Sequence, residues 1–182
     1  MRFLKRYWPL RTWWVYWLGL ANESPLRQPS EVGNGLWVGG VPLPRRWREL
    51  QVAGVGRVVT LLGEAAPAPW LASAESLLWL PVRDNHPPTI DQLRIGCAFI
   101  DAGRNGGPGT LISCGAGIGR ATTLYLAWRI ATTGEPLQAA LAALRRQRPI
   151  ADPTRRQMES LRQWEDERQE LGRLSEQGRP RP

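Results

Sequence analysis

A short stretch of the chain, residues 110–123 (TLISCGAGIGRATT), brings together a potential nucleophile and groups that bind anions. It begins with an apolar run that predicts a buried strand, and it continues into an apolar segment that predicts a helix. Cys114 follows the strand and Arg120 marks the start of the helix. The loop between them consists of small or apolar residues: Gly115, Ala116, Gly117, Ile118 and Gly119. The sequence therefore places a thiol and a guanidinium at the two ends of one tight turn.

This loop has the properties of an anion-binding site. Its glycines let the backbone curl tightly and turn successive N–H groups inward as a nest. The following helix adds unpaired N–H groups and the positive end of its dipole, and Arg120 can offer two parallel N–H bonds to an oxyanion. The same field favours the thiolate form of Cys114, which is a nucleophile. We therefore expect the loop to hold a phosphate-sized oxyanion above a thiolate that can accept a phosphoryl group. An inert buried cysteine and a phosphate-binding loop without catalysis are the alternatives.

A second stretch that could do chemistry, residues 83–89 (RDNHPPT), follows an apolar segment that predicts a strand. Phosphoryl transfer from an ester needs a proton for the departing oxygen, and a carboxylic acid on a mobile loop can supply it. Asp84 is the candidate for this general acid; the alternative is an ordinary turn residue before a helix that Thr89 or Asp91 caps. His86, the only histidine, is expected at most to contact the pocket rim. With one histidine and two cysteines, we expect no metal site and no cofactor.

The segments around these two loops alternate between short apolar strands and helices. Strands are predicted over residues 35–40, 57–62, 77–82 and 110–112. Helices are predicted over residues 44–53, 70–76, 90–105, 121–133 and 136–148, and a last helix is predicted to start with Asp152 as its cap. This alternation predicts one α/β domain with a central, mostly parallel sheet of about four to five strands flanked by helices.

The chain of 182 residues suits one domain with short appendages. We expect a Trp- and Arg-rich segment and linker over residues 1–34, the α/β domain over residues 35–174, and a disordered tail over residues 175–182. The longest charge-free run of the first part, residues 12–22, is too short for a transmembrane helix, which needs about 20 apolar residues. Its tryptophans and basic residues suit either a peripheral membrane contact or, as we favour, packing against the domain.

The net charge of +8 suits acidic substrates such as phosphoproteins, phosphoinositides or RNA ends, an anionic membrane, or a solvated surface with no specific partner. We favour the solvated surface, because the predicted helices would expose Arg145, Arg146, Arg148, Arg155 and Arg156. The only two cysteines, Cys97 and Cys114, predict no disulfide scaffold, and an essential thiolate suits the reducing cytoplasm. Under oxidation the two thiols could form a reversible bond.

The stretch from Cys114 to Arg120 resembles the signature loop of the cysteine-dependent protein tyrosine phosphatases, in which five residues separate a cysteine and an arginine. Residues 35–164 are similar to the dual-specificity branch of this superfamily, including the position of Asp84 after a strand and before a proline pair. The resemblance implies a phosphatase that hydrolyses phosphate monoesters through a phosphocysteine intermediate. Its substrate would be a phosphorylated protein or a small phosphate ester. Gln157 lies near a glutamine that is common in the family and is expected to be structural.

Two positions depart from the family pattern. A histidine usually precedes the cysteine, where this chain has Ser113, and a Ser or Thr usually follows the arginine, where it has Ala121. The missing hydroxyl helps the thiolate to leave in the second step, and Thr122 could replace it only if the helix start is turned to suit. We therefore expect a slow second step, an accumulating phosphocysteine and a burst of product.

Three classes of function are compatible with these residues. The first is an active phosphatase on phosphotyrosine, phosphoserine/threonine or a non-protein ester such as a phosphoinositide or an RNA end. The second is a catalytically weak or inactive relative that binds phosphate, and the third is a sulfur- or arsenate-handling enzyme. The Asp84 loop, upstream of the cysteine, favours the first class over the third. We expect a cytoplasmic protein, with membrane association as an option, no general nucleic-acid partner, and an oligomeric state that the sequence leaves open.

Overall fold

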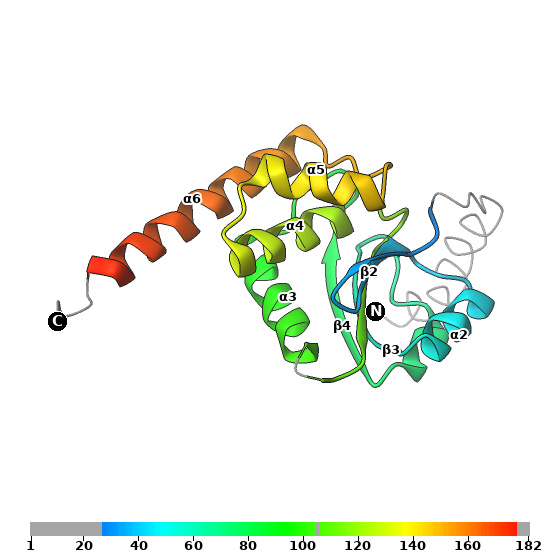
Figure 1. Ribbon diagram of the computed structural model, residues 1–182. Coiled ribbons are helices and arrows are strands. Elements are labelled where there is room, and N and C mark those ends of the chain that lie inside the picture. Colours follow the sequence, from blue (N-terminus) through cyan, green and yellow to red (C-terminus); the bar gives the residue numbers. More distant parts are fainter. Residues whose placement is uncertain (1–26, 105, 178–182) are drawn as a thin grey trace, which may run out of the picture.

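The computed structural model describes residues 27–104 and 106–177, and a five-stranded sheet forms its centre (Figure 1). The strands are β1 (Ser30–Gly33), β2 (Leu36–Gly40), β3 (Val55–Leu62), β4 (Ser76–Val82) and β5 (Gly109–Cys114). Their order across the sheet is β1-β2-β5-β3-β4. β1 is antiparallel to β2, and the other three pairings are parallel. The predicted α/β domain with a mostly parallel sheet is confirmed, and β5 is its central strand.

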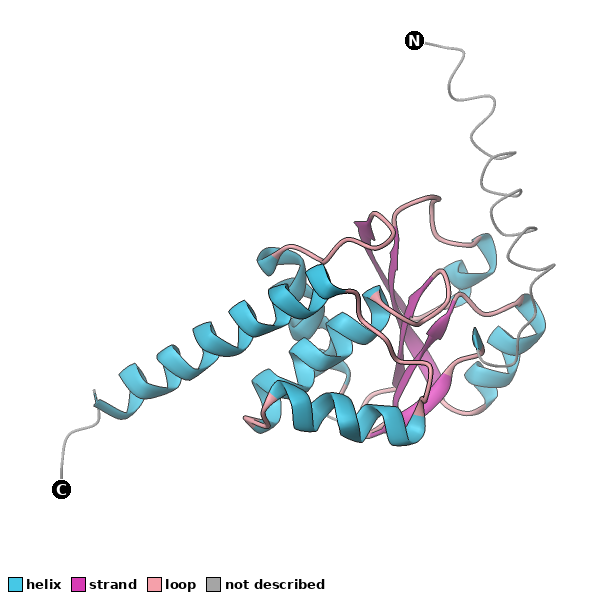
Figure 2. Ribbon diagram, turned by 90° about the horizontal axis from the view of Figure 1, so that it is seen from above, coloured by secondary structure: helices cyan, strands magenta, loops and turns pink. Residues whose placement is uncertain are grey.

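Helices cover both faces of this sheet, as the view from above shows (Figure 2). The α-helices are α2 (Pro44–Val52), α3 (Ile90–Gly103), α4 (Arg120–Thr133), α5 (Leu137–Gln147) and α6 (Arg155–Gln177), and a short 3-10 helix, η2, spans Pro69–Ser73. The sheet residues Val58 and Leu111 pack with α2 and η2, whereas Val59 and Ile112 pack with the helices of the other face. Successive strand residues are therefore buried on opposite faces, which explains the uninterrupted apolar runs of β3 and β5.

The topology determines where the two chemical loops meet. Parallel strands direct their carboxyl ends to one edge of a sheet. β5 ends there at Cys114, β4 ends at Val82 just before Asp84, and β3 ends at Leu62 just before Glu64. The turn after β5 leads directly into α4, whose first residue is Arg120. Three segments far apart in the sequence therefore bring polar side chains to the same edge.

Two segments differ from the sequence-based expectation. Residues 30–33, expected to be part of a linker, form β1, and the turn to β2 is tight because Gly33, Asn34 and Gly35 all adopt positive φ. At α6 the predicted cap, Asp152, is wrong. Thr154 takes this role, since its hydroxyl accepts from the Gln157 N–H while the Gln157 side chain accepts from the Thr154 N–H.

The ends of the chain lie partly outside the described residues. α6 runs to Gln177 and projects past the other helices (Figure 1), so residues 175–177 of the expected tail are helical. Leu174-Ser-Glu-Gln177 contains no helix-breaking residue, which explains the extension. Residues 1–26 of the predicted Trp- and Arg-rich segment and the tail residues 178–182 lie outside the described part. Among the helices that are described, none is long and apolar enough to cross a membrane.

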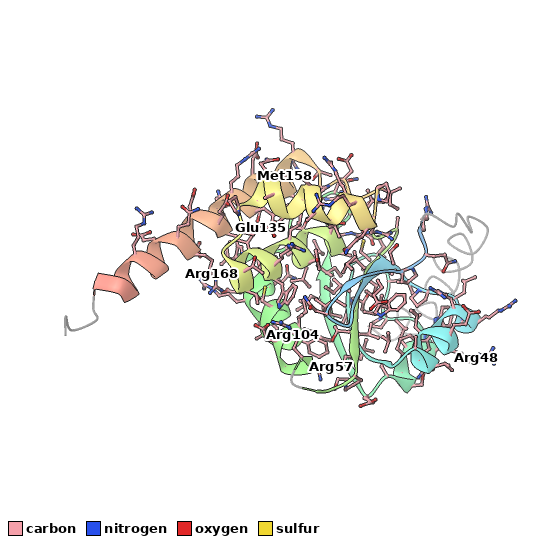
Figure 3. All side chains as sticks on the ribbon, in the orientation of Figure 1. Arg48, Arg57, Arg104, Glu135, Met158 and Arg168 are labelled. Carbon is pink, nitrogen blue, oxygen red and sulfur yellow. The ribbon has the colours of Figure 1, made fainter. Side chains whose placement is uncertain are left out.

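Several arginines pack against aromatic rings that the helices carry. The guanidinium carbon of Arg57 lies 4.2 Å from the ring centroid of Phe99, and that of Arg168 lies 4.3 Å from the ring of Trp164. Arg104 stacks similarly on Trp128, at 5.1 Å. Figure 3 shows Arg57 and Arg104 near the lower end of α3, and Arg168 beside α6. Part of the positive charge therefore covers apolar surface through cation–π contacts.

Candidate active site

The turn between β5 and α4 is pressed against the end of β2. Gly117 has φ +67°, and a Cβ added there would lie 2.2 Å from the backbone carbon of Gly39. The Val41 N–H also donates to the carbonyl of Cys114 (2.9 Å). Only glycine at position 117 permits this close backbone approach together with a left-handed φ. The end of β2 thus fixes the curvature of the loop.

Three consecutive carbonyls of the loop point outward into hydrogen bonds with the segment after α5. The Arg148 side chain donates from Nη2 to Ala116 O (3.1 Å) and from Nε to Gly117 O (2.9 Å). The Asp152 N–H donates to Ile118 O (3.0 Å). The N–H of a trans peptide unit points opposite to its carbonyl. The N–H groups that follow these carbonyls are therefore turned to the inner side of the loop, as an anion nest requires.

The sulfur of Cys114 lies on this inner side. The Gly117 N–H donates to Cys114 Sγ at 3.2 Å, and the cysteine is only 3% exposed. Both cysteines of the chain are free thiols. A sulfur that accepts an N–H bond from its own loop is held at the floor of the nest, where a thiolate could attack the phosphorus of a bound phosphate ester.

The guanidinium of Arg120 is buried and bound by two carboxylates. Nη1 donates to both oxygens of Glu64 (3.0 and 2.8 Å) and to the carbonyl of Val82 (2.7 Å), while Nη2 lies 3.1 Å from Asp84 Oδ1. The same Nη2 would lie 3.3 Å from a Cβ placed on Gly115, so it sits beside the loop. Both carboxylates belong to this edge of the sheet. The ion pairs therefore connect the end of the signature loop with the loop that carries Asp84.

Glu64 connects Arg120 and Asp84 a second time, and the sequence-based reasoning missed it. Its Oε1 accepts from the Asp84 N–H at 2.8 Å. Partial burial raises the pKa of Glu64, but the hydrogen bond and charge of Arg120 outweigh this, so the net pKa lies below the usual 4.5. The sequence offered one signal, because Glu64 is an acidic residue that closely follows a predicted buried strand, residues 57–62.

The loop with Asp84 is anchored to the start of α6. Thr154 Oγ1 donates to the carbonyl of Asn85 (3.3 Å), and Gln157 Nε2 donates to the carbonyl of His86 (3.0 Å). The Asp84 side chain itself is 66% exposed. His86 is half-buried, and its Nδ1 lies 2.9 Å from the Asp84 carbonyl oxygen. The backbone of the loop is thus held while the Asp84 carboxylate remains open to solvent and to a substrate.

Two residues depart from the family pattern and a third could compensate for them; all three are buried where β5 and α4 meet the loop. Ser113 is fully buried, and its hydroxyl donates to the carbonyl of Val59 (3.4 Å). Ala121 is fully buried and has no polar side-chain atom. The Thr122 hydroxyl donates to the Gly117 carbonyl (3.3 Å), which places this bond on the outer side of the loop.

Arg148 was expected to be solvent-exposed, and this expectation is wrong. Only 1% of the residue is accessible. α5 ends at Gln147, and Arg148 leaves the helix with φ −137°. The side chain therefore turns inward below the loop instead of following the exposed helix face of Arg145 and Arg146. The sequence offered one signal, the proline directly after this arginine, which ends the helix.

Comparisons with known proteins agree with this architecture. The dual specificity phosphatase catalytic domain model matches residues 52–167. The chain is 30% identical over 132 residues to Dual specificity protein phosphatase 22-B of Danio rerio, covering 67% of this chain and 69% of the relative. It is also 30% identical over 143 residues to Phosphatidylglycerophosphate phosphatase PTPMT2 of Arabidopsis thaliana, covering 75% of this chain and 63% of the relative. It matches only 23% of the longer Dual specificity protein phosphatase 5 of Homo sapiens, at 32% identity over 49% of this chain.

The fold has counterparts among solved structures. The crystal structure of Tk-PTP in the active form superposes with a TM-score of 0.69 and 28% sequence identity, over 76% of this chain and 97% of that one. The family model covers well over half of the present chain. The chain therefore belongs to the dual specificity phosphatase family and is a cysteine-based phosphatase.

Proposed function

We propose that this phosphatase hydrolyses phosphate monoesters in two steps, with Cys114 as nucleophile, Arg120 as the phosphate-binding cation and Asp84 as general acid and base. The observation that carries the proposal is the convergence of these three groups. The Gly117 N–H binds the Cys114 sulfur at 3.2 Å, and Arg120 Nη2, beside the same loop, lies 3.1 Å from Asp84 Oδ1. A nucleophile, an oxyanion nest and a proton donor thus share one edge of the sheet.

In the first step the Cys114 thiolate attacks phosphorus, so that an S–P bond forms while the P–O bond to the alcohol breaks. The inward N–H groups and Arg120 stabilise the charge on the equatorial oxygens. Asp84 gives its proton to the departing oxygen. The bond from Arg120 Nη2 to Asp84 must pass to a phosphate oxygen, which releases the carboxyl group to act as an acid.

In the second step water attacks the phosphocysteine. Asp84 takes a proton from the water, the S–P bond breaks, and inorganic phosphate and the thiolate are released. Ala121 supplies no hydroxyl to assist this departure, and the Thr122 hydroxyl is bound to the Gly117 carbonyl. We propose that breakdown of the phosphocysteine is the slower step.

The substrate class proposed first is a phosphorylated protein, with phosphotyrosine or phosphoserine/threonine at the site. Its support is the relationship to the dual specificity protein phosphatases. The second candidate is a phosphate ester of a lipid, and its support is the 30% identity to the relative named a phosphatidylglycerophosphate phosphatase. The loop positions 115–119 contain no basic residue, so they offer no extra charge for a substrate with several phosphates.

Hydrolysis of p-nitrophenyl phosphate tests the proposed roles. Compared with the wild type, we expect Cys114→Ser to lose at least about 10³-fold in kcat and Asp84→Asn about 10²-fold. Asp91→Asn is the matched control, because Asp91 is an exposed carboxylate on α3 that pairs with Arg94. This control should retain the wild-type rate. Wild-type kcat in Cys114→Ser would refute the nucleophile assignment, and a wild type that binds phosphate without turnover would favour the binding-only alternative.

A panel of esters distinguishes the substrate classes. Phosphotyrosine and phosphothreonine peptides would be compared with phosphatidylglycerophosphate in mixed micelles, each at matched phosphate concentration. A kcat/KM at least about tenfold higher for the peptides would support the protein substrate. The reverse order would support the lipid. Asp84→Asn should slow the alkyl esters more than p-nitrophenyl phosphate, because a poor leaving group depends more on the proton.

The reducing cytoplasm remains the proposed location. Both thiols are free, and Cys114, the proposed nucleophile, must remain reduced to act.

The described residues contain no cluster of three or more His, Cys, Asp or Glu side chains that could hold a metal ion. The proposed chemistry needs none, since the nest and Arg120 supply the positive field.

A further inference from the structure

Arg148 lies between the signature loop and the first strand of the sheet. Besides its bonds to the loop carbonyls of Ala116 and Gly117, Nη1 donates to the carbonyl of Gln28 (2.9 Å) and to the hydroxyl of Ser30 (3.1 Å). These four acceptors are neutral oxygen atoms. The fork geometry of a guanidinium allows this one side chain to bridge residues 28–30 and residues 116–117, which lie far apart in the sequence.

The bond to Ala116 places the Arg148 charge one peptide unit away from the nucleophile. Arg148 Nη2 donates to the carbonyl of Ala116, and the N–H of the same peptide unit, that of Gly117, donates to Cys114 Sγ. Hydrogen bonds in such a chain polarise one another, so a cation on the carbonyl strengthens the N–H as a donor. Burial lowers the pKa of Arg148, and the negative charge of Cys114 opposes this effect.

A buried cation is costly unless its hydrogen bonds compensate for lost water. Arg148 fulfils this condition by binding backbone oxygens of the loop. The buried position of the guanidinium and the shape of the loop therefore depend on each other. A purely structural residue would also lower stability when replaced. It would not, however, selectively change how the loop binds an oxyanion.

We infer that Arg148 is a positioning residue of this phosphatase, which together with residues 28–30 holds the inward-facing N–H groups of the signature loop against Cys114 and the bound oxyanion. The inference rests on the proposed function and extends it to a part of the chain that the sequence assigned to a linker. Gln28 and Ser30, at and just before the start of β1, thus support the site through Arg148.

The test compares Arg148→Met and Arg148→Lys with the control Arg129→Met. Arg129 is likewise an arginine that donates side-chain hydrogen bonds, to Glu135 and to the Tyr125 hydroxyl, but it lies in the C-terminal half of α4, away from the loop. Thermal unfolding first establishes that each variant is folded. Orthovanadate, a phosphate-like oxyanion, is then titrated by calorimetry, and kcat and KM are measured separately with p-nitrophenyl phosphate.

We expect Arg148→Met to bind orthovanadate at least about tenfold more weakly and to lose more in kcat than in KM, because the inward N–H groups act mainly in the transition state. Arg148→Lys keeps the charge but cannot bridge both carbonyls, so it should recover only part of the affinity. Arg129→Met should lower the melting temperature and leave vanadate affinity within about twofold. Ser30→Ala should weaken vanadate binding less than Arg148→Met does.

A folded Arg148→Met variant with wild-type vanadate affinity would overturn the inference. If that variant does not fold, Arg148→Lys takes its place, and wild-type affinity in Arg148→Lys would overturn it equally. Wild-type orthovanadate affinity in Ser30→Ala would show that β1 takes no part in holding the loop. The titration needs no turnover, so a wild type that binds vanadate but hydrolyses no ester would defeat the proposed function without affecting this test.

Discussion

Arg120 Nη1 lies 3.0 Å from one carboxylate oxygen of Glu64 and 2.8 Å from the other, so this ion pair joins the signature loop to the end of β3. Because Glu64 also accepts from the Asp84 N–H, one carboxylate contacts both Arg120, the proposed phosphate-binding cation, and the loop of the proposed acid. A charge-assisted hydrogen bond of this kind is stronger than a neutral one and fixes geometry as well as charge. Glu64 therefore has consequences for kinetics and for stability that can be measured separately.

The first prediction concerns catalysis by Glu64→Gln. The amide keeps the size of the side chain but loses the charge that holds Arg120, so kcat/KM for p-nitrophenyl phosphate should fall about tenfold. Glu49→Gln is the control, because Glu49 also pairs with an arginine, Arg46, but does so on the surface of α2. Its kcat/KM should equal that of the wild type. Equal kinetics in Glu64→Gln and the wild type would contradict the orienting role.

The second prediction concerns the pH dependence of stability. Since the folded-state pKa of Glu64 lies below its usual value of 4.5, the ionised carboxylate stabilises the fold above about pH 4.5. This contribution is lost as the pH falls through the folded-state pKa. The difference in free energy of unfolding between the wild type and Glu64→Gln should thus be constant near pH 7 and shrink below about pH 4.5. Urea titrations at pH 7, 5, 4 and 3 would measure it, and a difference that grows toward acid pH would contradict the sign.

The third prediction separates backbone strain from crowding at two glycines. Gly117 and Gly134 share a φ of +67°, but an added Cβ would meet Gly39 at 2.2 Å in the first case and nothing within 4 Å in the second. Gly134→Ala should cost about 1 kcal/mol of stability through the left-handed φ alone and leave orthovanadate binding intact. Gly117→Ala must also displace the loop from β2 and should abolish vanadate binding. Calorimetric titration of both variants checks this, and wild-type affinity in Gly117→Ala would refute the packing argument.

The fourth prediction concerns the residue after Arg120. Ala121→Ser introduces a hydroxyl at a buried helix position where one could assist departure of the Cys114 thiolate. We expect the wild type to release about one equivalent of p-nitrophenol in a fast phase followed by slower turnover, and Ala121→Ser to shrink this burst while raising kcat several-fold. Rapid mixing with absorbance detection resolves the two phases. A wild type with a linear time course from the first turnover would contradict a slow second step.

The strands and helices that the sequence predicted correctly are those whose pattern is local. The run over residues 57–62 is apolar because β3 is buried on both faces of the sheet. The run over residues 77–82 is also apolar and identifies a strand, but the expectation that this strand is buried is wrong, because β4 lies at the edge of the sheet and leaves Leu77 and Trp79 exposed. β1 has only one buried residue, Val32, and its strand conformation depends on pairing with β2. A four-residue edge strand between a proline and a glycine turn carries no such periodic signal.

The residues of the candidate site also differ in whether a local sequence pattern reveals them. Cys114 and Arg120 are recognisable because one continuous turn holds both, and Asp84 because it follows a strand before a proline pair. Glu64 forms an ion pair with Arg120, which is 56 residues away in the sequence. Arg148 donates to the backbone carbonyl of Gly117, which is 31 residues away. Neither contact leaves a local pattern. The parallel topology, which brings several strand ends to one edge, places Glu64 beside the loop, and the end of α5 places Arg148 there.

The fifth prediction concerns the selectivity of the two thiols. Burial raises the pKa of Cys97 to about 12, so at pH 7 its thiolate fraction is only about 10⁻⁵. Cys114 accepts an N–H bond and lies at the floor of the nest. Iodoacetamide at pH 7 should therefore modify Cys114 in the folded protein, and orthovanadate should protect it by occupying the loop.

Peptide mass spectrometry after brief alkylation would locate the label, and Cys97→Ala is the matched control. That variant should be labelled and protected like the wild type, because Cys97 takes no part in the reaction. In strong denaturant both cysteines should react at similar rates, since unfolding removes the burial that suppresses the Cys97 thiolate. Labelling of Cys97 ahead of Cys114 in the folded protein would show that the buried α3 thiol, rather than the loop cysteine, is the reactive one.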